Sequence, residues 1–377
     1  MENKVLMNPF NPSFGKVPEI FLGRSGILKK IVQGLENYNS PYQTTMIYGV
    51  RGVGKTSLLT DVAHTMKKKE NWIVVNLIPN VNLMSNLMES IYQQATSEVK
   101  KVLDRIDGVK LSAFKEAVDI EFHKSSYKFT TQVMLESVLK KLKAQGIHLL
   151  VTIDEAASTE EIKNFAALYQ VMIREEYWIS LIMTGLPEQI SELQNDKVLT
   201  FLLRSKKIKL DPLKAMDIKY RYKRVFTQAN RKLSDDLATK MTLLTNGYAY
   251  AFQLLGYLVW ESENSVITEE TLKSILDEYK EELYSNVYSK IYTELSSMDR
   301  KFIDAMIKFI SEKQDNRGRQ IPIAYIEKEL GKPHNYVVNY RHRLLEDQVI
   351  EAPQRGSVQF TLPFFKEFVE DNSIFFS

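Results

Sequence analysis

Residues 49–56 read Gly-Val-Arg-Gly-Val-Gly-Lys-Thr, and this octapeptide constrains the fold more than any other part of the chain. A run rich in strand formers, 44–48, precedes it, and a run with helical spacing, 57–63, follows it. A strand, a glycine-rich loop and a helix in this order are typical of a phosphate-binding loop, in which backbone amides and a helix N-terminus face an anion. A chance glycine turn is the alternative, but it does not explain the flanking runs. The segment therefore predicts a nucleoside triphosphate site.

The residues of this loop have separate expected roles. Lys55 would reach the β- and γ-phosphates and take part in catalysis, and the Thr56 hydroxyl would ligate Mg²⁺. Arg51 is more readily placed with its side chain toward solvent or a partner. The residues expected to contact the nucleotide from this segment are Gly49, Val50, Arg51, Gly52, Val53, Gly54, Lys55, Thr56 and Ser57.

Length and composition set the class of protein. A chain of 377 residues predicts two or three domains, and 44% hydrophobic with 26% charged residues is typical of a soluble globular protein. Cysteine is absent, which excludes disulfides and thiolate metal sites and fits a reducing cytoplasm. The N-terminus does not resemble a signal peptide, and no run is long enough to cross a membrane. We expect a cytoplasmic protein with no membrane partner. The net charge of +3 neither favours nor excludes nucleic acid.

Strand-like and helical runs alternate through the first half of the chain. Apolar runs of strand length occur at 44–48, 72–77, 148–153, 178–184 and 207–210, and helical runs occur at 27–35, 57–63, 83–104 and 131–144. This alternation predicts an α/β fold with a mostly parallel sheet covered on both faces. Ligands of such sheets bind at the carboxyl ends of the strands, where the phosphate-binding loop also falls.

Asp154 and Glu155 end the apolar run 148–153. A carboxylate at the end of a buried strand is unfavourable unless it faces a cation or a hydrogen-bond donor. Beside a phosphate-binding loop we expect Asp154 to hold Mg²⁺ opposite Thr56, and Glu155 to orient or deprotonate the attacking water. An acidic turn after a core strand is the alternative.

Two further side chains are candidates for catalysis. Thr184 ends the run 178–184, so its hydroxyl could sense the γ-phosphate or the attacking water; it could equally cap the turn at Gly185. Arg204 precedes the last short strand and is a candidate arginine finger acting on the nucleotide of a neighbouring subunit, which would require a homo-oligomer. Arg204 could instead belong to a solvated basic run.

The second half of the chain is helical from Pro212 to Thr293. Between Arg204 and Lys232, eleven Lys or Arg accompany two Asp, and Tyr220, Tyr222 and Phe226 lie among them. Such a surface could follow a phosphate backbone. The charges could also form a solvated face and the aromatic residues part of a core.

The last segment predicts a winged helix-turn-helix. Helical runs at 299–312, 323–330 and 335–345 precede two short strand-like runs, 349–352 and 358–362. Recognition of double-stranded DNA would involve Asn339, Arg341 and Arg343 on the last helix and Arg355 at the hairpin tip. From Glu294 onward, however, twelve basic residues accompany thirteen acidic ones, so a protein-binding role stays open.

Together these motifs resemble the AAA+ superfamily, and within it the ATPases similar to origin-recognition proteins. The resemblance includes Asn8-Pro9-Phe10, Phe14-Gly15 and Phe21-Leu22-Gly23-Arg24, the Walker A loop 49–56 and the Walker B pair 154–155. It implies that Phe21, Gly23 and Arg24 lie against the adenine. It also implies that Thr184 is the first sensor residue and that 247–253 opens the last helix of a lid.

Two departures from that family stand in the lid. No arginine occurs between Gly247 and Trp260, and Ala249 stands where some relatives have proline. The resulting prediction is a P-loop AAA+ core (1–211), a helical lid (212–293) and a winged helix (294–377). The expected function is an ATP-binding and ATP-hydrolysing switch that controls DNA binding. The alternative is a signalling ATPase whose winged helix binds protein.

Overall fold

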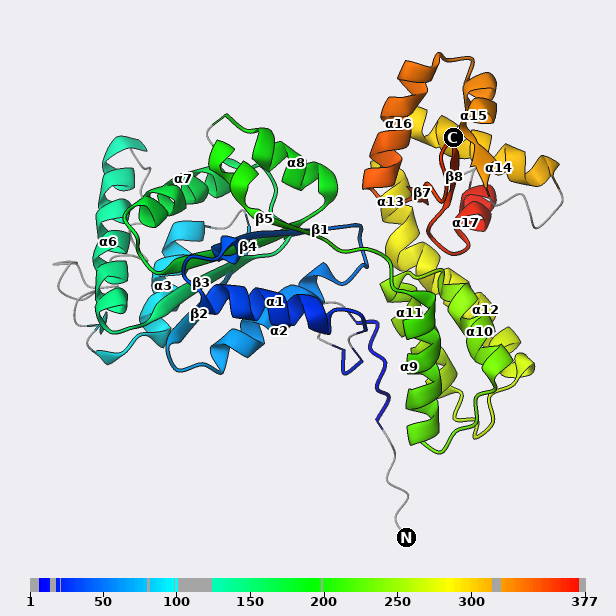
Figure 1. The fold of residues 1–377 in the computed structure, drawn as a ribbon, viewed down its shortest axis with the longest axis horizontal. Coiled ribbons are helices and arrows are strands. Elements are labelled where there is room, and N and C mark those ends of the chain that lie inside the picture. The colour runs from blue at the N-terminus through cyan, green and yellow to red at the C-terminus, as the bar shows by residue number, and fades with distance from the viewer. Residues whose placement is uncertain are drawn as a thin grey trace, which may run out of the picture. The chain divides into compact units, whose positions relative to one another are not determined.

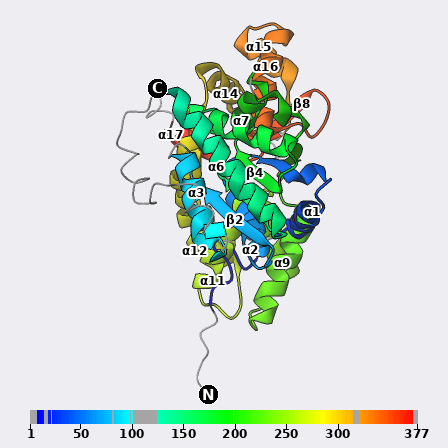
Figure 2. The ribbon, with the colours of Figure 1, turned by 90° about the vertical axis from the view of Figure 1, so that its left-hand side faces the viewer.

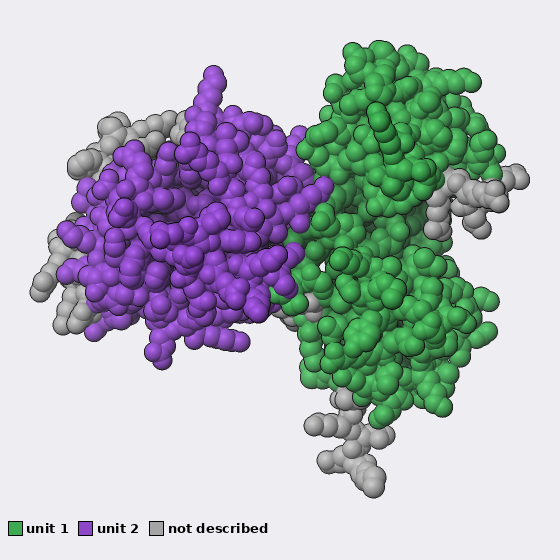
Figure 3. All heavy atoms as spheres, in the orientation of Figure 1, with its two compact units in different colours: residues 1–25, 49–54, 210–377 green, residues 26–48, 55–209 purple. Residues whose placement is uncertain are grey.

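The computed structural model describes residues 7–13, 18–20, 22–79, 82–97, 99–100, 124–197, 199–313 and 320–372. Contacts divide the chain into two compact units (Figure 3): unit 1 is 1–25, 49–54 and 210–377, and unit 2 is 26–48 and 55–209. The loop 49–54 thus belongs by its contacts to unit 1, although in sequence it lies between two stretches of unit 2. Each unit has its own core.

Unit 2 contains a five-stranded sheet in which all pairs are parallel. Its order is β2-β3-β4-β1-β5. The strands are β1 (Thr44–Tyr48), β2 (Trp72–Leu77), β3 (His148–Ile153), β4 (Ile179–Gly185) and β5 (Lys206–Lys209). The predicted parallel α/β sheet is therefore confirmed, with strand limits within a residue or so of those predicted.

Helices of unit 2 connect these strands. They are α1 (Ser25–Glu36), η1 (Pro41–Gln43), α2 (Lys55–Lys67), α3 (Leu83–Gln94), α6 (Lys124–Ala144), α7 (Glu160–Arg174), α8 (Pro187–Asn195) and η2 (Thr200–Arg204). The helix predicted over 83–104 ends at Gln94, and the part of it beyond residue 100 lies outside the described residues.

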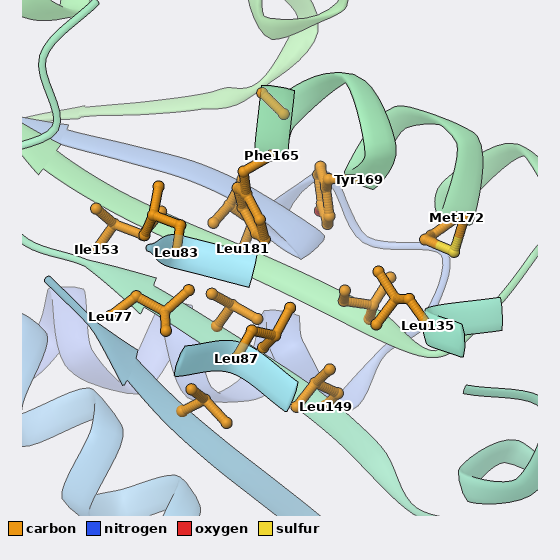
Figure 4. Close-up of a cluster of buried hydrophobic side chains, with 14 of the residues drawn as sticks. Leu77, Leu83, Leu87, Leu135, Leu149, Ile153, Phe165, Tyr169, Met172 and Leu181 are labelled. Carbon is orange, nitrogen blue, oxygen red and sulfur yellow. The ribbon is translucent and has the colours of Figure 1, made fainter. Parts of the chain in front are cut away.

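The two faces of the sheet carry different side chains, because successive residues of a strand point to opposite faces. One face is apolar: α3 packs on β2, α6 on β3 and α7 on β4 (Figures 1 and 2). Figure 4 shows the resulting cluster, which includes Leu77, Leu83, Leu87, Leu135, Leu149, Ile153, Phe165, Tyr169, Met172 and Leu181. Burying each such side chain stabilises the fold by about 1.5–3 kcal/mol.

The opposite face of the sheet is covered by α2, which packs on β2, β3 and β4. Thr152 in β3 and Thr184 in β4 point to this face, as does Asp154 just beyond β3. The alternation therefore places polar side chains under the start of α2. Leu58 and Val62 of α2 supply the apolar contacts on the same side.

The first half of unit 1 is helical. Its elements are α9 (Ala215–Gln228), α10 (Asp235–Thr245), α11 (Ala249–Glu261), α12 (Glu269–Leu283), the π-helical turn η3 (Tyr284–Tyr288) and α13 (Ser289–Glu294). Phe10 of the N-terminal arm is buried against the rings of Tyr222, Phe226 and Phe252. Lys219 and Lys223 pair with Asp235.

These contacts bear on the basic, aromatic run of the sequence. Tyr222 and Phe226 are fully buried core residues, whereas Tyr220 is 64% exposed. The run is thus a helix with a solvated basic face and a core face, and its aromatic residues do not form a common exposed surface.

The second half of unit 1 is a small α/β region. Its elements are α14 (Ser297–Glu312), β6 (Ile321–Pro322), α15 (Ile323–Leu330), α16 (His334–Glu346), β7 (Ile350–Glu351), β8 (Ser357–Phe360) and α17 (Phe365–Asn372). The strands form an antiparallel sheet in the order β6-β8-β7. The three predicted helices and the hairpin are present. The sequence did not predict β6 or α17, because two-residue strands and short terminal helices give weak periodic signals.

Candidate active site

The loop 49–54 joins the end of β1 to the start of α2, and its glycines have positive φ. Gly52 has φ +72° and Gly54 has φ +94°, a region that side chains disfavour. The amide of Val53 faces back across the turn and donates to the carbonyl of Val50 at 3.4 Å. Successive amides in such a turn form a concave group that suits an anion.

Three consecutive carbonyl groups of this loop accept hydrogen bonds from elsewhere in unit 1. The Tyr248 hydroxyl donates to the carbonyl of Arg51 at 2.7 Å. The amide of Tyr250 donates to the carbonyl of Gly52 at 3.1 Å. Nη2 of Arg24 donates to the carbonyl of Val53 at 3.2 Å. These three carbonyls thus face the start of α11 and the residues just before α1, and we call the side of the loop that they face its outer side.

Arg24 supports the backbone in two places. Its side chain is buried, and Nη2 also donates to the carbonyl of Asp211 at 2.8 Å. Burial lowers the pKa of Arg24, and nearby Asp211 raises it. The nucleotide contact expected of Arg24 must compete with these bonds. Gly23 lies in the preceding turn with φ +71°, and Phe21 lies outside the described residues.

In unit 2, the structure brings Asp154, Thr56 and Thr184 together. Thr56 Oγ1 donates to Asp154 Oδ2 at 2.7 Å, and Thr184 Oγ1 donates to Asp154 Oδ1. The register explains this meeting: Ile153 pairs with Met183, so the next residues of the two strands, 154 and 184, are neighbours on the face covered by α2. Thr56 lies in the first turn of α2.

The oxygen atoms of Thr56 and Asp154 fit a magnesium ion. Mg²⁺ takes oxygen ligands in octahedral geometry at about 2.1 Å, so adjacent ligands lie about 3 Å apart. The hydroxyl and carboxylate oxygens are 2.7 Å apart. No group of three or more His, Asp or Glu side chains in the described ranges could hold a metal ion unaided. Such a sparse protein ligand set suits Mg²⁺ that also binds substrate phosphates.

Glu155 has an unusual backbone conformation at the end of β3. Its φ of +52° lies in the left-handed region, which costs a non-glycine residue about 1–2 kcal/mol. Its amide donates to Asp154 Oδ1 at 3.2 Å and to Thr184 Oγ1 at 3.1 Å, and these bonds hold the conformation. The side chain is exposed. The strained turn thus presents the Glu155 carboxylate to solvent next to Asp154.

The remaining predicted residues of this site lie as follows. Lys55 begins α2 and is 9% exposed, and Ser57 lies two residues further along the same helix. Arg204 ends η2 and is exposed, and Ser205 separates it from the strand β5. Leu203 beside it is 52% exposed.

The four residues predicted to bind DNA differ in their surroundings. Asn339 on α16 and Arg355 in the β7–β8 turn are exposed, and Arg341 is half-buried. Arg343 lies in an ion pair: its Nε and Nη2 donate to the buried carboxylate of Asp299 at 3.1 and 2.6 Å. Its Nη2 also donates to Ser296 Oγ at 2.8 Å. The guanidinium of Arg343 therefore serves the packing of α16 on α14.

The sequence interpretation missed several of these partners. Tyr248 and Tyr250 were noticed only as part of a lid segment, and the hydrogen bond from Tyr248 spans 197 positions of sequence. Glu294, which pairs with Arg51 at 2.9 Å, carried no signal. Asp299 did carry one, since Ser296 and Asp299 have the spacing of a capping box at the start of α14.

Comparison with known families supports this fold. Residues 29–174 match the bacterial DnaA ATPase domain, and residues 285–369 match a domain of unknown function, DUF8462. Over 120 residues the chain is 28% identical to the chromosomal replication initiator protein DnaA of Buchnera aphidicola subsp. Baizongia pistaciae (strain Bp). That match covers 32% of this chain and 24% of the relative, so it spans about a quarter of the curated protein.

Solved structures are similar over nearly the whole chain. The Walker-type ATPase PABY2304 of Pyrococcus abyssi has a TM-score of 0.55 at 15% identity, covering 93% of this chain and 96% of that one. The Aeropyrum pernix ORC2 protein in its ADPNP–ADP complexes has a TM-score of 0.57 at 13% identity, covering 97% and 98%. At these identities the likeness establishes the fold. The predicted α/β fold with a parallel sheet is confirmed, and it is similar to the folds of this Walker-type ATPase and this ORC2 protein.

Proposed function

We propose that the chain binds ATP with Mg²⁺ and hydrolyses it slowly, as an AAA+ ATPase similar to the origin-recognition proteins; the similarity of its fold to theirs supports this proposal. The observation that carries this proposal is the Asp154 carboxylate, which accepts hydrogen bonds from Thr56 and Thr184 at the carboxyl edge of the sheet. These residues supply oxygen ligands and a sensing hydroxyl next to the strained Glu155. The loop before α2 supplies the amides for phosphate.

Each residue of the site has a role in this proposal. Lys55 neutralises the β- and γ-phosphates, and Thr56 with Asp154 holds Mg²⁺, which would supply charge neutralisation for the phosphates. Glu155 orients the attacking water and accepts its proton. The Thr184 hydroxyl donates to the Asp154 carboxylate and accepts from the Glu155 amide, and these two bonds keep Asp154 and Glu155 in a fixed position relative to each other.

We propose further that nucleotide state controls DNA binding through a winged helix formed by α14, α15, α16 and the β7–β8 hairpin. The exposed face of α16 supports this reading. Tyr336 is 36% exposed and packs against Tyr340 at 5.1 Å, and the Lys332 ammonium lies 5.4 Å from the Tyr336 ring. Asn339 is exposed on the same helix, and Arg355 is exposed in the hairpin. Polar, basic and aromatic groups of this kind suit a nucleic acid.

Protein binding by the same region is the second candidate function. It is favoured by two observations: the region is almost neutral, with twelve basic and thirteen acidic residues, and Arg343 is paired with Asp299. A near-neutral surface gains little from the counterion release that drives DNA binding.

One experiment separates the two candidates. Binding of a mixed-sequence duplex by the full chain is measured with ATP and with ADP over a salt series, for the wild type and for Arg341→Ala and Arg355→Ala. DNA binding predicts tighter association with ATP and a salt slope that decreases in the variants. Arg343→Ala is unsuitable because it also breaks an internal ion pair. Absence of binding in both nucleotide states would favour the protein-binding function.

A further inference from the structure

The peptide units of the loop 49–54 are oriented by their carbonyl partners. Because a trans peptide is planar, the carbonyl of one residue and the amide of the next point in opposite directions. The carbonyls of Arg51, Gly52 and Val53 are bound on the outer side of the loop. The amides of Gly52 and Gly54, which belong to two of these peptides, therefore face the inner side, where the concave turn would receive phosphate, whereas the amide of Val53 donates to the carbonyl of Val50.

At the N-terminus of α11, Tyr248 binds the loop through its side-chain hydroxyl, whereas Tyr250 binds it through its backbone amide. The residue is 4% exposed, and burial raises its pKa well above the ordinary value, so the hydroxyl remains a neutral donor. Its ring lies 6.3 Å from that of Tyr250. Nearby, the hydroxyl of Tyr250 accepts from Asn286 Nδ2 at 3.0 Å.

The fit between Tyr248 and the loop leaves no spare room. A Cβ atom added to Gly52 would lie 2.1 Å from the Tyr248 hydroxyl oxygen and 2.8 Å from the ring carbon that bears it. Real Cβ contacts are never this close. Gly52 is therefore required both for its positive φ and for the approach of Tyr248.

We propose that Tyr248 is a positioning residue of the nucleotide site. Through its hydroxyl, the lid acts on the backbone of the loop and does not contact the nucleotide itself. The inference rests on the proposed nucleotide binding at 49–56. No arginine occurs between Gly247 and Trp260, and the hydroxyl of Tyr248 holds the peptide between Arg51 and Gly52 in the orientation that phosphate needs. Removal of the hydroxyl frees that peptide to rotate, and the nucleotide must then order it.

The test compares two tyrosines that make the same kind of hydrogen bond. In Tyr248→Phe the loop loses one donor. The control is Tyr279→Phe. Tyr279 is fully buried, and its hydroxyl, which donates to the carbonyl of Leu244 at 3.0 Å, is lost in this variant. Affinities of the full chain for ATP and ADP are measured by fluorescence titration, together with the melting temperature without nucleotide.

The expected result separates stability from positioning. Both variants should melt at a similarly reduced temperature, because each loses one buried hydroxyl bond. Only Tyr248→Phe should bind nucleotide about five- to tenfold more weakly, as the loss of one hydrogen bond implies. ATP and ADP should be affected by the same factor, since the loop holds the phosphates that the two share.

Three outcomes would overturn the inference. Unchanged affinity in Tyr248→Phe, with wild-type binding intact, removes the positioning role alone. An equal loss of affinity in Tyr279→Phe assigns the effect to general stability. Absence of nucleotide binding in the wild type overturns the proposed function, and the inference with it.

If Tyr248→Phe folds poorly, a second pair of variants tests the action of the lid on the neighbouring peptide, between Gly52 and Val53, whose carbonyl accepts from the amide of Tyr250. Tyr250→Ala keeps the amide that donates to Gly52, whereas Tyr250→Pro lacks it. Proline is tolerated in the first turn of a helix, where Tyr250 lies. Weaker nucleotide binding in the proline variant than in the alanine variant supports the inference, and equal binding in the two contradicts it.

Discussion

Asp154 receives two hydroxyl hydrogen bonds from elements far apart in sequence, one from α2 and one from β4. Its oxygens also lie within reach of the next amide in the chain, that of Glu155. A single carboxylate thus fixes three neighbouring groups. This explains why the Glu155 backbone can remain in a strained conformation, and it makes the pair 154–155 the natural place to test for chemistry.

The first prediction concerns Lys55 and Glu155. Lys55→Ala should abolish nucleotide binding, because the ammonium that neutralises the phosphates is lost. Glu155→Gln should retain nucleotide affinity within about twofold but lose hydrolysis by about 10²–10⁴-fold, the usual contribution of a general base. Equilibrium titration and single-turnover phosphate release measure the two quantities. Turnover at the wild-type rate in Glu155→Gln would remove that residue from the catalytic role.

At the scale of elements, an aromatic stack closes the amino ends of β2, β3 and β4. The His148 ring lies 4.7 Å from Trp72 and 4.3 Å from Trp178, nearly parallel to both. Burial lowers the pKa of His148, because the charged imidazolium is poorly solvated there. The folded protein therefore binds this proton less readily than the unfolded chain does.

The second prediction follows from that stack. Above the unfolded histidine pKa of about 6.5 the neutral ring stabilises the fold, and this stability is lost as the pH falls from there toward the lower folded pKa. The melting temperature of the wild type should fall between pH 7.5 and 5.5 more steeply than that of His148→Phe, which keeps a stacked ring but cannot titrate. Parallel pH profiles for the two proteins would show that His148 does not contribute.

The third prediction concerns the packing of α16 on α14. Arg343→Ala leaves the buried carboxylate of Asp299 with Ser296 as its remaining side-chain partner, and should cost about 1–3 kcal/mol in the free energy of unfolding. The range allows for the partial exposure of Arg343. Arg355→Ala, a matched loss of an exposed guanidinium, should change that free energy by less than about 0.5 kcal/mol.

Urea denaturation followed by circular dichroism compares these two variants. If both variants lose the same free energy of unfolding, the ion pair of Arg343 does not stabilise the fold. Arg343 would then be available for the predicted role in DNA recognition. Because of the ion pair with Asp299, we expect Arg343→Ala to lose more free energy of unfolding than Arg355→Ala.

The elements show which features of the fold are predictable from sequence. The strands and most helices could be predicted because periodicity and turn residues act over a few positions, as in the run that became β3. The meeting of Asp154 with Thr184 could be anticipated from the ends of neighbouring strands. The bond from Tyr248 to Arg51 could not, because nothing local marks which of many buried tyrosine hydroxyls will meet a loop 197 residues away. The ion pair of Arg343 with Asp299 could not be predicted either, since a basic residue on a helix gives the same sequence pattern whether it faces solvent or a buried acid.

At the scale of the whole molecule, the loop 49–54 is linked to the segment that precedes α14. The Arg51 guanidinium pairs with Glu294, the last residue of α13, and Lys290 shares that carboxylate at 3.3 Å. Both members of the Arg51–Glu294 pair are partly exposed, with side chains 31% and 40% accessible. Solvent and salt screen such a pair, so its own energy is small.

The fourth prediction is a double-mutant cycle on this pair. Arg51→Gln and Glu294→Gln, singly and together, should show a coupling energy below about 1 kcal/mol at low salt, and almost none at 1 M salt. Thermal or chemical unfolding of the full chain measures the cycle. A larger, salt-independent coupling would show that the pair is less solvated than its exposure indicates, and that it links the loop to α13 more strongly than expected.

Because the loop depends on Tyr248 and Tyr250, the segment that contains these residues cannot be exchanged freely between related proteins. The octapeptide 49–56 is contiguous in sequence, but two of the three donors to its carbonyl groups, those of Tyr248 and Tyr250, are encoded about two hundred positions later. A chimaera that takes residues 212–293 from a relative inherits new groups opposite the loop, and only an incoming lid with a donor at the place of Tyr248 preserves its shape. We therefore expect lid and loop to be exchangeable only together, even though no peptide segment contains both.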